Sequence, residues 1–105
     1  MGITGSLDNL GTVATRAWHK APFARSQPSD KYELFIEGAN HMSFISAETV
    51  VKARSSQAAA ILGYTNSASL AFWDAYLKED PAARQFLESD AIERSTHGAA
   101  KLSRR

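Results

Sequence analysis

Two side chains, Asp8 and His41, have the residue types and the spacing for acid–base chemistry. Asp8 stands a few residues after the apolar run 1–4, and His41 stands after a second apolar run, 32–36. The segment between the runs is long enough for one crossover helix. A carboxylate after one strand and an imidazole after the next can form two thirds of a Ser-Asp-His triad. In that triad the imidazole takes the serine proton and the aspartate orients the imidazole.

The third member of such a triad, the serine nucleophile, is not evident in the sequence. No Gly-x-Ser-x-Gly motif occurs in the 105 residues. Ser43, two residues after His41, is expected to cap its loop rather than to attack a substrate. The sequence therefore predicts the acid and the base of a hydrolase without the nucleophile, and we expect the chain to be part of a longer enzyme.

The two apolar runs predict short buried strands. Residues 1–4 are expected to be the end of one strand, and residues 31–37 are expected to form the other. Between them, residues 12–20 have the apolar spacing of a short helix, which Pro22 should end. A strand, a helix and a strand in this order form a βαβ unit, which implies parallel strands.

The remainder of the chain is predicted to be mainly helical. Residues 48–63 have no clear assignment, although 57–62 favour a helix, and residues 67–78 have the clearest helical pattern. Its apolar side chains are Leu70, Phe72, Trp73, Tyr76 and Leu77. We expect the aromatic members to pack in the core. The alternative is a face that binds a ligand or a partner.

Asp80 and Pro81 predict the start of a last helix, with Asp as its N-cap and Pro at its first position. From Ser95 onward the residues are small, polar and basic, so residues 95–105 are expected to be a flexible basic tail. No linker divides the preceding sequence, and we expect residues 1–94 to belong to one domain.

Composition and charge argue against several classes of partner. The formal net charge is +1 and the basic residues are scattered, so nucleic acid is not an expected partner. No segment resembles a membrane span or a signal peptide, so we expect a soluble protein without a membrane partner, cytoplasmic by default. The chain has no cysteine. His19 is expected to be solvated and His97 to lie in the tail, and neither has carboxylates at metal-ligand spacing. No metal or cofactor is expected.

Residues 5–8 (Gly-Ser-Leu-Asp), Arg16 and residues 31–42 (Lys-Tyr-Glu-Leu-Phe-Ile-Glu-Gly-Ala-Asn-His-Met) together carry a resemblance to a known family. They are similar to the C-terminal third of an α/β-hydrolase, and most similar to the dienelactone-hydrolase-like and acetylhydrolase-like esterases. Residues 70–78 (Leu-Ala-Phe-Trp-Asp-Ala-Tyr-Leu-Lys) resemble the final helix of these enzymes, which packs on the sheet. The resemblance covers residues 1–90.

The resemblance implies a fold, a function and roles for two residues. The fold would be α/β, a partial α/β-hydrolase fold with the last two parallel strands, a crossover helix and C-terminal helices. The chain would be the C-terminal fragment of a serine esterase that acts on a small-molecule ester. His41 would be the general base and Asp8 its orienting partner. The nucleophile elbow and the oxyanion loop of the family are missing, so a truncated gene product, inactive alone, is expected.

Both candidate residues also have ordinary structural explanations. Asp8 stands in a Gly-Ser-Leu-Asp-Asn turn, where its carboxylate can bond the local backbone, and His41 can be a polar loop residue. The chain would then be a small non-catalytic binding or interaction protein derived from a hydrolase domain. A lone pair of parallel strands also leaves a sheet edge free. We therefore expect a marginally stable chain that self-associates through that edge.

Overall fold

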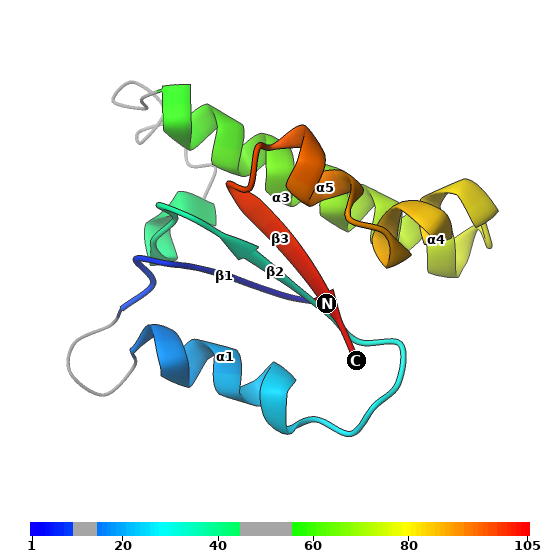
Figure 1. The fold of residues 1–105 in the computed structure, drawn as a ribbon, viewed down its shortest axis with the longest axis horizontal. Helices are drawn as coiled ribbons and strands as arrows, with labels where there is room; N and C mark the ends of the chain where they lie inside the picture. The colour runs from blue at the N-terminus through cyan, green and yellow to red at the C-terminus, as the bar shows by residue number, and fades with distance from the viewer. Residues whose placement is uncertain (10–14, 45–55) are drawn as a thin grey trace.

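The computed structural model describes residues 1–9, 15–44 and 56–105. The elements in chain order are β1 (Gly2–Gly5), α1 (Arg16–Arg25), β2 (Tyr32–Ile36), the 3-10 helix η1 (His41–Phe44), α3 (Ser56–Leu77), α4 (Pro81–Glu88), α5 (Ala91–Ser95) and β3 (Ala100–Arg104). They form a small α/β domain. Figure 1 shows the sheet in the middle, with α1 on one side and α3, α4 and α5 on the other.

The strands form one mixed sheet in the order β1-β2-β3. β1 and β2 run parallel, with Gly2 opposite Glu33 and Gly5 opposite Ile36, which confirms the predicted parallel pair. β2 and β3 run antiparallel. β2 is therefore the central strand, and the expectation of a sheet with only two strands is wrong.

The prediction of a flexible tail at residues 95–105 is also wrong, because residues 100–104 of this segment form β3. Ala100 and Leu102 pack toward the core, and Leu34 of β2 lies opposite Leu102. The chain turns from α5 into β3 through Gly98, whose φ of +83° suits glycine. The strand was not predicted because the alternation of apolar and polar residues in β3 is short and is surrounded by polar residues.

The core lies between the sheet and the helices α3, α4 and α5. Alternate side chains of β2, namely Tyr32, Leu34 and Ile36, point to this side and are at most 1% exposed. The helices contribute the buried side chains Ile61, Ala68, Ala75, Leu87 and Ile92. This burial fixes the register of β2, because a shift by one residue would turn Glu33 into the core.

The opposite face of the sheet is more polar and carries α1. Glu33 lies on this face and is 4% exposed, and the Lys20 Nζ lies 3.8 Å from its Oε1. Lys20 also lies over the ring of Phe35, 4.6 Å from its centroid. Burial raises the pKa of Glu33 above its ordinary value of 4.5, and the positive charge of Lys20 offsets part of this rise. Glu33 is therefore a buried carboxyl group with incomplete charge compensation.

The helix between the parallel strands, α1, extends further than the sequence predicts. It begins after Thr15, whose hydroxyl accepts a hydrogen bond from the backbone N–H of Trp18 at 3.3 Å. It continues through Pro22 to Arg25, although the proline was expected to end it. Proline removes one backbone hydrogen bond, but its φ is compatible with a helix, and here the helix tolerates that loss. Residues 12–14 of the predicted helix lie outside the described residues.

One long helix, α3, replaces two segments that the sequence treats separately. It contains the residues 57–62, which favour a helix in the sequence, and nearly all of the predicted helix 67–78. Residues 48–55 of the unassigned segment lie outside the described part of the chain. The two segments with helical propensity, 57–62 and 67–77, therefore belong to one helix.

The aromatic residues of α3 divide between the core and the surface. Phe72 and Tyr76 pack against Tyr32, with ring centroids 6.0 and 6.2 Å apart, as expected for core residues. The exposed apolar side chains are Leu70, Trp73 and Leu77, at 61%, 55% and 73%. Their spacing of three and four residues places them along one side of the helix. The core prediction is therefore right for two of the three aromatic residues, and wrong for the tryptophan.

The start of α4 is as the sequence predicts. The carboxylate of Asp80 accepts hydrogen bonds from the backbone N–H groups of Ala82 at 2.8 Å and Ala83 at 3.4 Å, and Pro81 is the first helical residue. This helix is not the last one, since α5 follows it. Within residues 1–9, 15–44 and 56–105, no helix has the length and apolar character needed to cross a membrane.

Candidate functional site

The segments that follow β1 and β2 are hydrogen-bonded to one another at one end of the sheet. The backbone N–H of Ser6 donates to the carbonyl of Ile36 at 3.0 Å, and that of Leu7 donates to the carbonyl of Ala39 at 2.9 Å. The hydroxyl of Ser6 accepts a hydrogen bond from the backbone N–H of Gly38 at 2.8 Å. Because the carboxyl ends of parallel strands meet at one edge, the side chains that follow them are brought together here.

Two glycines make this close approach feasible. Gly5 ends β1, and a Cβ at this position would overlap with the backbone of Ala39. Gly38 begins the turn after β2 with a φ of +77°, a conformation that side-chain-bearing residues rarely adopt. The positions of Asp8 and His41 therefore depend on glycine at both strand ends.

Asp8 is held at the end of the β1 segment with its carboxylate buried. Its side chain is 5% exposed. The hydroxyl of Thr4, in β1, donates a hydrogen bond to Asp8 Oδ2 at 3.1 Å. The backbone N–H of Asp8 donates to the Gly5 carbonyl at 3.2 Å, a turn contact that does not use the carboxylate. The carboxylate is therefore directed into the site.

His41 lies at the first position of the 3-10 helix η1, which Asn40 caps. The side-chain oxygen of Asn40 accepts hydrogen bonds from the backbone N–H of Met42 at 3.0 Å and from the hydroxyl of Ser43 at 3.1 Å. The Ser43 hydroxyl in turn accepts from the backbone N–H of Asn40 at 3.0 Å. Ser43 thus caps η1 together with Asn40, as the sequence predicts. This cap fixes the backbone of η1 and so the direction in which the His41 side chain points.

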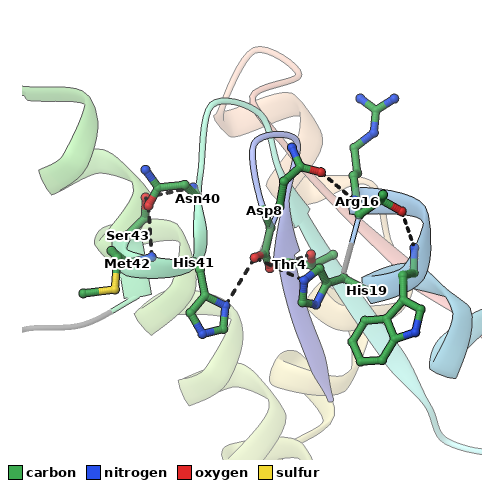
Figure 2. Close-up of polar contacts among 11 residues, drawn as sticks. Thr4, Asp8, Arg16, His19, Asn40, His41, Met42 and Ser43 are labelled. Atoms are coloured by element: carbon green, nitrogen blue, oxygen red, sulfur yellow. Dashed lines mark hydrogen bonds and ion pairs between the residues drawn. The ribbon is translucent and has the colours of Figure 1, made fainter. Parts of the chain in front are cut away.

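The carboxylate of Asp8 and the ring of His41 face one another, as Figure 2 shows. The Nδ1 of His41 lies 3.3 Å from the Oδ1 of Asp8, a contact within hydrogen-bonding reach. The residues come from the ends of two adjacent parallel strands, as predicted. The structure thus brings together the two residues that the sequence singles out, while their catalytic role stays a prediction.

The geometry of this pair determines what His41 can do chemically. A hydrogen bond to the carboxylate requires the proton on Nδ1, which leaves a lone pair on Nε2. Figure 2 shows this second nitrogen turned away from Asp8, and the side chain of His41 is 51% exposed. An imidazole in this tautomer can accept a proton from a group that approaches from solvent. The buried carboxylate of Asp8 then stabilises the imidazolium that forms.

A third residue, His19, reaches the same carboxylate and was missed in the sequence. It was expected to be solvated, but its side chain is 15% exposed and its Nε2 lies 3.5 Å from Asp8 Oδ1. Its ring centroid is 6.2 Å from that of His41. The contact depends on how α1 packs on the sheet, which the helical pattern does not reveal. The one local feature in the sequence that could have helped to locate His19 is the helix N-cap at Thr15, one helical turn before it.

The remaining polar residues at this edge do not add a metal centre. In the described ranges of the chain, no group of three His, Cys, Asp or Glu side chains is arranged to hold a metal ion. The two histidines approach the Asp8 carboxylate from different sides, as Figure 2 shows. Arg16 contributes through its backbone N–H, which donates to the side-chain oxygen of Asn9 at 2.9 Å. His97 is an exposed residue of the turn before β3.

Comparison of the chain with protein-family models, with curated proteins and with solved structures gives no match. The functional argument therefore depends on the geometry of the residues at the carboxyl ends of β1 and β2.

Proposed function

We propose that Asp8 and His41 are the acid and the base of a serine-hydrolase triad, and that the chain is the C-terminal part of a carboxylic-ester hydrolase with a partial α/β-hydrolase fold. The contact of 3.3 Å between His41 Nδ1 and Asp8 Oδ1 is the observation that carries this proposal. Its support is the combination of a buried acid, an exposed imidazole and an outward-facing Nε2 at the ends of two parallel strands.

The proposed mechanism gives each residue one role. The Nε2 of His41 takes the proton of a serine hydroxyl as this oxygen attacks the ester carbonyl. It then returns the proton to the leaving alcohol. Asp8 keeps the imidazole in the required tautomer and stabilises its charged form. The ester would bind at the exposed side of His41.

The two serines nearest to the pair in sequence do not supply the nucleophile in this proposal. The hydroxyl of Ser6 is buried and hydrogen-bonded to the Gly38 backbone, and that of Ser43 caps η1 with Asn40. Since the 105 residues also contain no Gly-x-Ser-x-Gly motif, the proposal places the nucleophilic serine outside them. In the described part of the chain β1 pairs with β2 alone, so its other edge can accept a further strand that brings this serine.

Labelling with a fluorophosphonate, which reacts with activated serines, tests the proposal. The coding sequence is extended upstream in its reading frame, and the extended protein is treated with the probe beside its His41→Ala and His97→Ala variants. We expect labelling of one serine in the extension, loss of this labelling in His41→Ala, and wild-type labelling in His97→Ala. Labelling that is unaffected by His41→Ala, or an extension without a reactive serine, would contradict the proposal.

A second candidate function is that of a non-catalytic interaction protein. The exposed stripe of Leu70, Trp73 and Leu77 on α3 favours it, because large apolar side chains gathered on one side of a helix commonly mark a contact surface. Sedimentation of the 105-residue chain distinguishes the two candidates. A monodisperse dimer that Trp73→Ser converts to a monomer supports the interaction protein. A wild-type chain that sediments as a monomer argues against it.

A further inference from the structure

We propose that His19 is a positioning residue for Asp8: its Nε2–H donates to Asp8 Oδ1 from the side opposite to His41 and holds the carboxylate in the orientation that His41 needs. This inference rests on the proposed function for its catalytic consequence. Its structural part, the protonation of one named nitrogen, stands independently of that function.

The Asp8 carboxylate is held by side chains from three different elements. In the described residues, its hydrogen bonds and ion pairs join it to Thr4 in β1, His41 in η1 and His19 in α1. The Thr4 hydroxyl binds Oδ2 at 3.1 Å, and both histidines approach Oδ1. A carboxylate held at one oxygen by one hydroxyl can still rotate about that contact. Donors on both sides of Oδ1 would remove this freedom.

The environment of His19 indicates which of its nitrogens carries the proton. Its Nε2 is buried and makes no well-aligned hydrogen bond with the described residues, although Asp8 Oδ1 lies 3.5 Å away. A buried ring nitrogen without a partner is costly. With a lone pair on Nε2, that nitrogen would face the negative carboxylate, which is unfavourable. With a proton on Nε2, it can donate to Oδ1 after a small rotation of the ring.

The same geometry separates the roles of the two histidines. His41 presents Nδ1 to the carboxylate and turns Nε2 away from it. His19 presents Nε2, and its ring packs edge-on against Trp18 with centroids 5.2 Å apart. Since the side chain of His19 is 15% exposed, compared with 51% for His41, it is poorly placed to meet a substrate. His41 is therefore the base, and His19 acts through Asp8.

Nitrogen-15 NMR of the uniformly labelled 105-residue chain tests the structural part without any substitution. Long-range correlations between ring nitrogens and carbon-bound ring protons show which nitrogen of a neutral histidine is protonated. At a pH where His19 is neutral, we expect its proton on Nε2 and that of neutral His41 on Nδ1. A His19 proton on Nδ1 would overturn the inference, whatever the activity of the longer enzyme.

Two variants then separate a hydrogen bond from simple packing. His19→Gln places an amide N–H near the position of Nε2, whereas His19→Met fills similar space without a donor. We expect His41 to keep its Nδ1–H tautomer in His19→Gln and to lose it in part in His19→Met, with His97→Gln as the control. An unchanged His41 tautomer in a folded His19→Met variant would overturn the positioning role.

Kinetics of the extended enzyme test the catalytic consequence separately. His19→Met should lower kcat about tenfold at unchanged KM, the scale of one hydrogen bond to a charged group, and His19→Gln should restore most of it. Unchanged kcat in His19→Met would overturn the positioning role, even where Asp8 and His41 prove essential. An enzyme insensitive to His41→Ala, with the His19 proton on Nε2, would contradict the proposed function and leave the structural part of this inference supported.

Discussion

The hydroxyl of Ser6 accepts a hydrogen bond from the backbone N–H of Gly38 at 2.8 Å and so joins the segment after β1 to the segment after β2. This bond spans 32 positions in sequence and lies between the strand ends that carry Asp8 and His41. The relative placement of Asp8 and His41 therefore depends on the side chain of Ser6 as well as on the pairing of the strands.

Replacement of this serine is expected to loosen the site. Ser6→Ala leaves the Gly38 N–H without its partner, and the cost should be about 1 kcal/mol of unfolding free energy. Urea denaturation monitored by tryptophan fluorescence measures the change. Ser29→Ala, at an exposed position, is the control and should stay within about 0.5 kcal/mol of wild type. Equal effects of the two substitutions would show that the bond does not hold the strand ends together.

A methyl group at Gly5 should be more harmful than one at Gly63. Gly5→Ala places a Cβ against the Ala39 backbone, and such overpacking costs about 1–3 kcal/mol. Gly63, in α3, has open space around an added Cβ, and Gly63→Ala should stabilise the helix by up to about 1 kcal/mol. The pair can be compared by thermal unfolding. A Gly5→Ala variant as stable as wild type would contradict the close approach of the two segments.

The buried carboxyl of Glu33 should make stability depend on pH in a defined direction. Burial raises its pKa in the folded state above the ordinary 4.5, so the folded chain binds the proton more tightly than the unfolded chain. The stabilisation from a neutral Glu33 is complete below the unfolded pKa and is lost as the pH rises through the folded pKa. Glu33→Gln is therefore expected to be more stable than wild type at pH 7.

The advantage of Glu33→Gln should shrink as the pH falls to about 4.5 and below, since wild-type Glu33 is then protonated too. Unfolding by urea over this range, with the exposed Glu37→Gln as control, isolates Glu33 from the other carboxyl groups. A destabilised Glu33→Gln variant at pH 7 would mean that the charge of Lys20 outweighs the effect of burial.

Elements with a dense local signal could be predicted from the sequence. β2 has five consecutive residues with four apolar side chains, and α4 begins at an Asp-Pro pair that both caps and starts the helix. The parallel pairing of β1 and β2 followed from the length of the segment between them. These features depend on residues close together in the chain, so composition and spacing were sufficient.

The missed features depend on contacts between distant segments. β3 has one large apolar residue, Leu102, and becomes a strand by pairing with β2. His19 faces Asp8 because α1 packs on the sheet at a particular angle, which no spacing within 16–25 encodes. At the site, strand ends alone indicated Asp8 and His41, whereas a third residue contributed by a helix could not be identified without the tertiary structure.

The 105-residue chain is expected to be inactive toward esters when isolated. The proposed fragment would lack the oxyanion hole of the family, and an imidazole alone stabilises the tetrahedral intermediate poorly. Hydrolysis of a short-chain aryl ester should therefore not exceed that of an equal concentration of imidazole. A saturable activity lost in Ser43→Ala would show instead that the chain holds its own nucleophile.

The turnover of an aryl ester by the upstream-extended enzyme, compared between wild type and Asp8→Asn, tests the central claim most directly. Asn keeps the size of the side chain but removes the charge and favours the wrong tautomer of His41. We expect kcat to fall by up to about 10⁴-fold with little change in KM. A kcat within a few-fold of wild type in a folded Asp8→Asn variant would contradict the assignment of Asp8 and His41 as the acid and base of a triad.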